Sequence, residues 1–227
     1  MNPTRKTPDL AANPAVNAAL AWAHSARFLT TASRLDQLPQ GELPEIAFVG
    51  RSNAGKSTAI NTLAQHRRLA FASKTPGRTQ HVNLFELGPA DAPDALFADL
   101  PGYGYAAVER DAKLRWQQVM ADYLRERRDL TGVVLLADSR LGLTELDQRL
   151  LDWISPRVRT GVVRLLVLLT KADKLSRKEA DASLRAATQA LGAYSSDEAD
   201  VNVALFSALH KTGLADVALT LHGWTHS

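Results

Sequence analysis

Residues 50–57 constrain this chain more than any other stretch, because they read Gly-Arg-Ser-Asn-Ala-Gly-Lys-Ser. They follow the apolar run 46–49 and precede residues 58–63, where a helix is expected. Glycines let successive backbone N–H groups wrap a polyphosphate, and a helix that begins near Gly55 turns the positive end of its dipole to the same anion. Lys56 would neutralise the β and γ phosphates, and Ser57 would offer a hydroxyl to Mg²⁺.

The alternative is a Gly-rich turn that only connects a strand to a helix. All fixed positions of the G-x-x-x-x-G-K-S spacing are present, together with the flanking pattern, and they favour a phosphate-binding P-loop. The nucleotide-binding positions predicted here are Gly50, Arg51, Ser52, Asn53, Ala54, Gly55, Lys56, Ser57 and Thr58.

A base-reading element is expected at Thr170, Lys171, Ala172 and Asp173, which follow the apolar run 162–169. The carboxyl end of such a buried parallel strand is where α/β sheets place ligands. The Asp173 carboxylate would accept hydrogen bonds from N1–H and the 2-amino group of guanine, whereas adenine offers no matching donors. Lys171 would lie along the purine face. The alternative for Asp173 is a helix N-cap.

Another acidic position follows the apolar run 96–98, where Asp99, Leu100, Pro101 and Gly102 come in order. P-loop proteins keep their second Mg²⁺ acid at this place, and Asp99 would hold the ion through water. Gly102 could turn its N–H to a γ-phosphate. Because that bond exists only with a triphosphate, the residues after it would form a switch. A plain Pro-Gly turn is the alternative.

The last apolar run, 201–205, precedes Phe206, Ser207 and Ala208. Their loop could present a backbone N–H to guanine O6. Ser-Ala after a strand is common, so this signal is weak alone and gains meaning only from its order behind the other motifs.

Alternation of strands and helices predicts an α/β, three-layer P-loop fold. We expect a six-stranded, mostly parallel sheet with one antiparallel edge strand and helices on both faces, in a single GTP-binding domain over 21–227 after a loose tail over 1–20. The expected strands are 45–49, 81–87, 95–99, 131–137, 162–169 and 201–205. The expected helices are 56–66, 111–128, 144–154, 176–191 and 212–222, with an irregular lead-in near 28–30.

On these motifs the chain resembles the translation-factor-related GTPases, and more closely the EngB/YsxC/YihA family of bacterial ribosome-biogenesis GTP-binding proteins. The resemblance runs from Phe28 to Trp224, and its most specific segments are residues 50–58, 73–80, 99–105 and 170–173. It implies a GTPase that binds GTP or GDP with Mg²⁺ and acts in assembly of the large ribosomal subunit. It also implies a role in cell division and septum formation.

The resemblance implies that residues 73–80 form switch I. Thr79 would then join Ser57 on Mg²⁺, and Gly77, Arg78, Thr79, Gln80 and His81 would wrap the nucleotide. From the residues alone, this stretch is a polar, turn-rich loop with positive charge, and Thr75 is a rival metal ligand.

Tyr103 stands where Ras-like GTPases carry a water-orienting Gln. Because a phenol cannot do the same work, unassisted hydrolysis is expected to be slow. Asn53 is a candidate ligand for a K⁺ ion held against the phosphates, and Arg78 is another candidate for supplying positive charge there. The alternative for Asn53 is that it only braces the loop by bonding to the backbone of switch I.

The 227 residues are 45% hydrophobic and 22% charged, carry a net charge of +3 and include no cysteine. These values fit one domain with a sizeable core, exclude disulfides and thiolate metal sites, and are compatible with a reducing cytoplasm. No apolar run approaches about 18–20 residues, so we expect no membrane span. Asn13, Pro14 and Asn17 interrupt the alanine-rich stretch 11–23, which argues against an export signal.

The resemblance implies rRNA and ribosomal proteins as partners of a cytoplasmic, monomeric protein. Clustered basic residues suit an RNA partner, although cations at helix ends are ordinary. A P-loop phosphotransferase is the rival enzyme class, and it would give Asp173 no purpose. A ribosome-binding module with incidental hydrolysis is the subtler rival. The basic clusters are Arg67, Arg68, Lys74 and Arg78; Arg125, Arg127 and Arg128; and Lys171, Lys174, Arg177 and Lys178.

Overall fold

The computed structural model describes residues 13–70, 81–104 and 110–226, with the side chains of 110–116 left out. A seven-stranded sheet lies at its centre, in the order β1-β3-β4-β2-β5-β6-β7. The strands are β1 (Arg27–Ala32), β2 (Glu45–Gly50), β3 (Val82–Leu87), β4 (Ala95–Asp99), β5 (Leu130–Asp138), β6 (Arg164–Thr170) and β7 (Val201–Leu205). The helices are α1 (Pro14–His24), α2 (Lys56–Leu63), α3 (Arg110–Glu126), α4 (Glu145–Arg159), α5 (Arg177–Leu191) and α6 (Leu214–Thr225).

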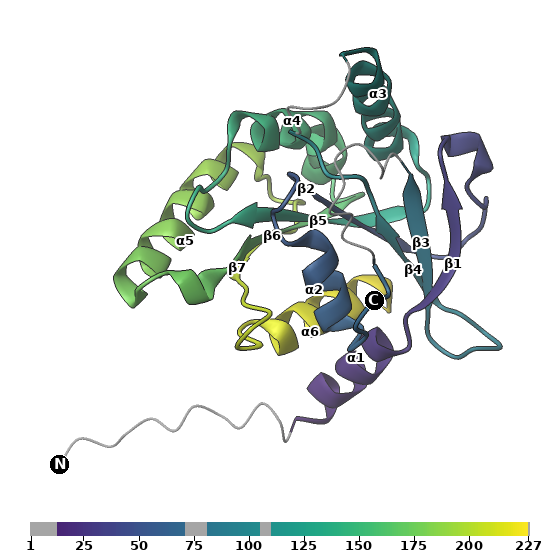
Figure 1. The fold of residues 1–227 in the computed structure, drawn as a ribbon, viewed down its shortest axis with the longest axis horizontal. Helices are drawn as coiled ribbons and strands as arrows, with labels where there is room; N and C mark the ends of the chain where they lie inside the picture. The colour runs from purple at the N-terminus through teal and green to yellow at the C-terminus, as the bar shows by residue number, and fades with distance from the viewer. Residues whose placement is uncertain (1–12, 71–80, 105–109, 227) are drawn as a thin grey trace.

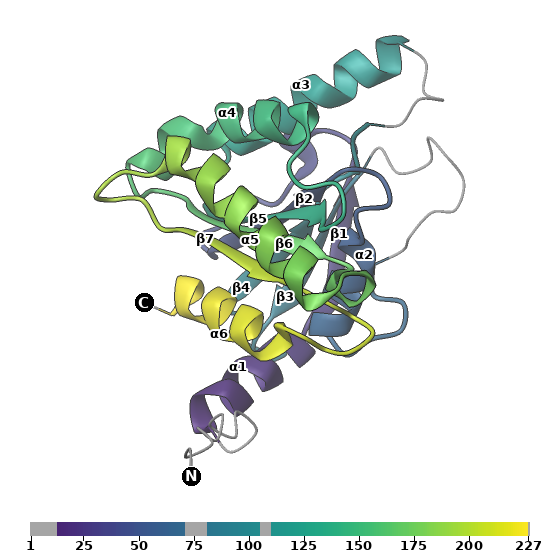
Figure 2. The same ribbon diagram turned by 90° about the vertical axis from the view of Figure 1, so that its left-hand side faces the viewer.

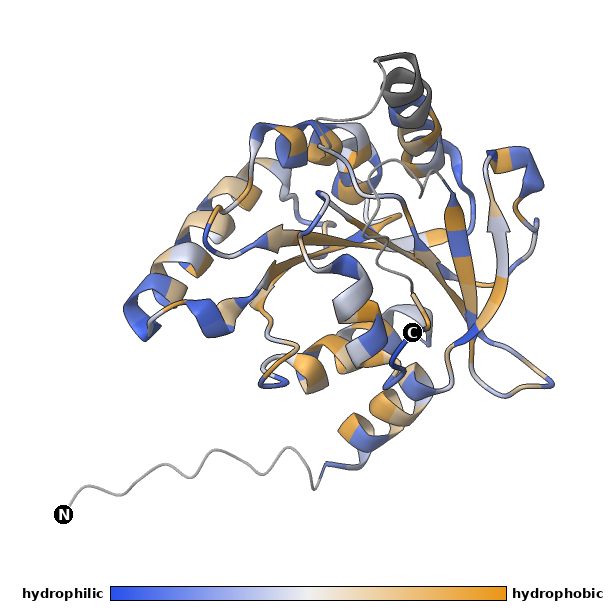
Figure 3. Cartoon of the chain, viewed as in Figure 1, coloured by the Kyte–Doolittle hydropathy of each residue, from blue (hydrophilic) through white to orange (hydrophobic). Residues whose placement is uncertain are grey.

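Helices cover both faces of the sheet, as Figures 1 and 2 show. Alternate residues of β2 point to opposite sides: Ala47 and Val49 join the core beneath α3, α4 and α5, whereas Ile46 and Phe48 join the core with α1, α2 and α6. Strands covered on both faces are continuously apolar, and the central strands β5 and β6 are accordingly orange over most of their length in Figure 3. The predicted three-layer α/β architecture is confirmed.

The predicted strand count and edge are wrong. Residues 27–32, expected to be an irregular lead-in, form β1, which pairs antiparallel with β3. The antiparallel strand β3 is therefore interior, between β1 and β4, rather than at the edge. Phe28 and Leu29 are exposed and a register irregularity lies between Phe28 and Thr30, so this strand lacks the alternation that marks a half-buried strand.

The residues 14–20, expected to belong to a loose tail, instead begin α1. Asn13 caps the helix, since its side chain accepts a hydrogen bond from Ala15 N at 3.0 Å, and Pro14 occupies the first turn. The helix buries Ala19 and Trp22 against the α6 side of the core. Asn13 and Pro14, which interrupt the alanine-rich stretch 11–23, therefore mark the start of α1.

Helix α4 continues past its predicted end at residue 154, to Arg159, with Pro156 inside it. Proline has no N–H to donate to the carbonyl of Asp152 one turn earlier. Ser155 Oγ donates to that carbonyl instead, at 3.2 Å. The other predicted helices agree with the structure apart from their ends. Within the described part of the chain, no helix is long and apolar enough to cross a membrane.

Candidate functional site

The P-loop joins β2, which ends at Gly50, to α2, which begins at Lys56. Gly55 has φ +95°, a left-handed conformation that glycine adopts without steric cost. A Cβ on Gly50 would lie 2.7 Å from the carbonyl oxygen of Leu136. Thr170 Oγ1, at the end of β6, donates a hydrogen bond to the carbonyl oxygen of Ala54 at 2.6 Å and so holds the loop against β6. The loop is therefore held in shape by the neighbouring strands.

Lys56 and Asp99 form an ion pair at the mouth of this loop. Their side chains come from the first turn of α2 and the end of β4, and are 11% and 3% exposed. A shielded cation beside a shielded carboxylate is the charge pattern that a phosphate and a divalent cation require together. The residues present therefore fit a Mg²⁺–nucleotide group, with Ser57 half-buried in the same helical turn.

The segment after β4 lies directly on the P-loop. A Cβ on Gly102 would come within 3.2 Å of Ser52 Cα and N, so only glycine fits this approach without a shift. Ser52 N donates to the carbonyl of Tyr103 at 2.8 Å. Leu100 and Pro101 are buried behind this contact. The predicted switch position and the predicted phosphate cradle are thus adjacent.

The loops after β6 and β7 meet at the predicted base-reading residues. Asp173 Oδ1 accepts a hydrogen bond from Ser207 Oγ at 2.7 Å, and Ala172 N donates to the carbonyl of Phe206 at 3.1 Å. The Ser207 hydrogen bond lowers the pKa of Asp173, which stays an ionised acceptor. The N-cap of α5 is Ser176, so the alternative role of Asp173 as its cap does not apply.

Lys171 connects this base side to the P-loop. Its backbone is left-handed, with φ +58°, and its Nζ donates to the carbonyl of Asn53 at 2.8 Å. The same ammonium donates to Asp138 Oδ2 at 2.9 Å. Two segments that are far apart in the sequence are therefore joined through one side chain.

Asp138 and Arg140 belong to this network, and neither was predicted. Asp138 is 8% exposed at the end of β5, and Arg140 donates to it through Nε at 2.9 Å and through a terminal nitrogen at 2.7 Å. The Arg140 hydrogen bonds hold the pKa of Asp138 well below its usual range, with Lys171 assisting. The sequence did offer a signal for Asp138: it is a carboxylate directly after the apolar run 131–137, and ligands bind at the carboxyl ends of parallel strands.

Tyr103 also has an unpredicted partner. Its hydroxyl donates to Asp147 Oδ1 at 2.5 Å, and Asp147 Oδ2 accepts from both the N–H and the hydroxyl of Thr144 at 2.7 Å. Burial raises the pKa of the Tyr103 phenol far above its usual value, with the Asp147 charge assisting. The phenol is therefore a neutral donor engaged with the start of α4.

Several predicted residues remain to be placed. Thr75, Gly77, Arg78, Thr79 and Gln80 lie outside the described residues. His81, Thr58 and Asn53 are exposed, and Ala208 is half-buried after β7. Arg127 does not contribute to the exposed basic cluster predicted with Arg125 and Arg128, because its guanidinium donates to buried Glu45 at 3.1 Å and its side chain is only 11% exposed.

The comparisons with known proteins agree with this arrangement. Residues 45–171 match the family described as "50S ribosome-binding GTPase". The chain is 59% identical over 207 residues to a "Probable GTP-binding protein EngB" of Acidovorax ebreus (strain TPSY), covering 91% of each chain. It is 55% identical over 226 residues to a protein of the same name from Polaromonas sp. (strain JS666), covering 99% of this chain and 89% of the relative.

Solved structures share the fold. A structure titled "Crystal structure of a probable GTP-binding protein engB" has a TM-score of 0.57 at 17% identity, covering 80% of this chain and 98% of that chain. A variant of Aquifex aeolicus Era bound to GDP and AlF4⁻ has a TM-score of 0.60 at 18% identity, covering 82% of this chain and 57% of that chain. The chain therefore belongs to the EngB family of GTP-binding proteins and is a GTP-hydrolysing enzyme.

Proposed function

We propose that this GTPase is a nucleotide-dependent switch. Its GTP form associates with the large ribosomal subunit or its precursor, and slow GTP hydrolysis releases the protein from that particle. The description "50S ribosome-binding GTPase" of the matching family supports the partner. The packing of Gly102 on Ser52 supports the switch, because a change in the P-loop would act directly on the segment after β4. The protein would act as a cytoplasmic monomer, and cell division and septum formation would depend on it.

The P-loop N–H groups and Lys56 would hold the β and γ phosphates. Ser57 and Thr79 would bind Mg²⁺, with Asp99 holding it through water; the bound ion supplies charge neutralisation at the phosphates. The Lys56–Asp99 pair supports this assignment, because both groups are already shielded and of opposite charge. Residues Gly77 to His81 would complete the envelope around the nucleotide.

Asp173 would read guanine, with the Lys171 stem along the purine face and the backbone of Ala208 toward O6. The Ser207 hydrogen bond to Oδ1 supports this role, because it helps to hold the Asp173 carboxylate ionised and oriented; Oδ2 lies 3.4 Å from the Lys174 ammonium. Lys171 would also transmit loading of the base site to the P-loop through Asn53.

Hydrolysis would be slow because no described side chain replaces the missing Gln beside the P-loop: Tyr103 donates to Asp147 instead. K⁺ held at Asn53, or Arg78, would supply the missing positive charge. These two roles remain predictions that rest on position in the chain.

Cosedimentation with purified ribosomal subunits tests the proposed function. Protein loaded with a non-hydrolysable GTP analogue should sediment with the large subunit more than protein loaded with GDP, at low and at moderate salt. The variant Lys56→Ala should lose the difference between nucleotides. Equal association in both states, or none with either subunit, would contradict the switch. Release that proceeds equally fast without hydrolysis would favour a module with incidental turnover.

A further inference from the structure

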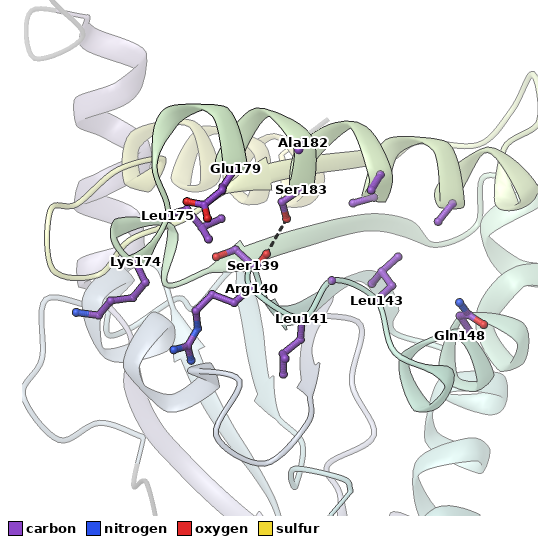
Figure 4. Close-up of a pocket in the computed structure, with 14 residues that line it drawn as sticks. Ser139, Arg140, Leu141, Leu143, Gln148, Lys174, Leu175, Glu179, Ala182 and Ser183 are labelled. Atoms are coloured by element: carbon purple, nitrogen blue, oxygen red, sulfur yellow. Dashed lines mark hydrogen bonds between the residues drawn. The ribbon is translucent and has the colours of Figure 1, made fainter.

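A groove runs between α5 and the loop that joins β5 to α4 (Figure 4). It has a volume of about 680 Å³ and lies outside the predicted nucleotide positions. Helix α5 lines it with small side chains, Ala182, Ala186 and Ala190, and Leu141, Leu143 and Leu175 line it from the loops. Ser183 Oγ donates to the carbonyl of Ser139 at 2.8 Å, which fixes the helix to the loop.

Much of the groove wall consists of exposed apolar side chains. Leu141 is 65% exposed, and Ala182, Ala186 and Ala190 are exposed on the same side of α5. Small residues let another backbone or a large apolar side chain approach the helix closely, and covering the groove would remove apolar surface from water. Such a surface suits an amphipathic protein segment.

One end of the groove has the chemistry of a carboxylate site. Ser139 is 4% exposed, and its hydroxyl, at the groove end beside Arg140 and Leu175 in Figure 4, has no hydrogen-bond partner among the described residues. The Arg140 and Lys174 side chains at this end are 50% and 58% exposed, whereas their own partners Asp138 and Asp173 are each 8% exposed. Glu179, an exposed carboxylate that accepts from Ser176 N at 2.8 Å, lines the same end, so the three exposed charged side chains leave a net charge of one positive. A buried hydroxyl without a partner favours a ligand that supplies an acceptor.

We propose that this groove docks an acidic, amphipathic protein segment of the ribosomal partner, with its apolar side chains on the alanines of α5 and a carboxylate at the end formed by Ser139, Arg140 and Lys174. This inference rests on the proposed function for the identity of the particle. A protein segment fits better than RNA because half of the lining residues are alanine or leucine and none is aromatic, whereas RNA is recognised through phosphate contacts and base stacking.

The groove and the nucleotide site share a connected set of side chains. Arg140 lines the groove and donates to Asp138, which also binds Lys171, and Lys171 holds the Asn53 carbonyl of the P-loop. Docking at the groove end would therefore act on the base side of the nucleotide site. By linkage, a partner that binds more tightly to one nucleotide form must strengthen binding of that nucleotide by the same factor.

The absence of cysteine allows a direct test in the full chain. Ala186→Cys, in the groove, and Gln189→Cys, exposed on the same helix outside the groove, each provide a unique thiol for a benzophenone photoprobe. Irradiation with purified large subunits and the GTP analogue should link the Ala186→Cys probe to a ribosomal protein, at an acidic segment identified by mass spectrometry. The Gln189→Cys probe should give much less of that product.

Affinity measurements complete the test. Ala186→Glu should weaken large-subunit binding about tenfold, whereas Gln189→Glu, with the same change in charge, should leave it within about twofold. Ser139→Ala should weaken binding severalfold without loss of thermal stability, because its hydroxyl has no internal partner to lose. All three variants should keep their GTP affinity.

The outcomes separate the two proposals. If the wild type binds and the variants bind equally well, or the probe links only to rRNA, the groove assignment is overturned while the switch stands. If the wild type binds no subunit in either nucleotide state, the proposed function is overturned, and the ribosomal occupant of the groove with it.

Discussion

At the scale of single residues, Asp138 organises the base side of the site. It is a shielded carboxylate that accepts from two cations, and one of them, Lys171, holds the P-loop at Asn53. Such charge-assisted hydrogen bonds are stronger than neutral ones because donor and acceptor carry opposite full charges. Asp138 therefore positions a nucleotide-binding side chain.

Asp138→Asn should weaken GTP and GDP binding about tenfold, because the neutral amide holds Lys171 less firmly. Fluorescent-nucleotide titration measures this effect, and urea unfolding checks that the variant is folded. Asp91→Asn, in the exposed connection between β3 and β4, is the matched control and should change nothing. Unaltered affinity in Asp138→Asn would remove Asp138 from the site.

Tyr103 makes a second prediction at this scale. Tyr103→Phe keeps the buried ring but leaves Asp147 Oδ1 without the hydroxyl donor, so the free energy of unfolding should fall by about 1–3 kcal/mol. Denaturant unfolding measures it. Ser155→Ala, which removes a hydroxyl on the exposed part of α4, is the comparison and should cost less. No loss in Tyr103→Phe would show that this hydrogen bond contributes little to the fold.

At the scale of elements, α1 is part of the folded body. Trp22 packs edge-on against Phe97, with ring centroids 5.5 Å apart, and its Nε1 donates to Asp94 at 2.8 Å. Trp22 is 7% exposed, so its removal leaves a cavity between α1, α6 and the sheet.

Trp22→Ala should lower the free energy of unfolding by about 3–5 kcal/mol, the usual cost of deleting a buried Trp side chain. Trp22→Phe keeps much of the packing and loses the Asp94 hydrogen bond, and should cost less. Urea unfolding of both variants provides the measurement. A loss below about 1 kcal/mol in Trp22→Ala would mean that α1 adds little to the fold.

The sequence predicted the elements that carry strong patterns and missed those that do not. Continuous apolar runs before Gly50, Asp99 and Thr170 predicted parallel strands and the positions of their loops. Strand β1 was missed because an edge strand needs neither alternation nor continuous burial. Helix α1 was missed because a helix of this length is only marginally stable by itself. Its stability depends on the packing of Trp22 against the core, which is a tertiary contact.

The candidate site shows the same limit. The P-loop, Asp99 and Asp173 were predictable because each follows a strand at a spacing that the chemistry requires. The Lys171–Asp138 and Tyr103–Asp147 interactions were not predictable, because their partners are 33 and 44 positions apart in the chain and meet only in the folded sheet.

At the scale of the whole molecule, two imidazoles make stability depend on pH. Burial lowers the pKa of His24, with Lys211 and His66 assisting, and burial followed by the charge of His226 lowers the pKa of His222. The unfolded chain therefore binds protons more readily than the folded protein, and stability is lost as pH falls through about 6.5 toward the lowered values.

Urea unfolding at about pH 7.5 and about pH 5.5 should show the lower stability at the acid value. Carboxylates whose pKa values are lowered, such as Asp173, remain ionised over this window and do not contribute. His222→Gln should reduce the difference between the two pH values. Greater stability at the acid pH would contradict the assignment.

The central claim at this scale is that the loops after β2, β6 and β7 form one guanine-nucleotide site. Competition binding of GTP, ATP and XTP to the wild type and to Asp173→Asn tests it most directly. The wild type should prefer GTP strongly, and Asp173→Asn should exchange that preference for XTP, because an amide can donate to the xanthine O2 and still accept from N1–H. GTP binding retained at wild-type affinity in Asp173→Asn would contradict the claim.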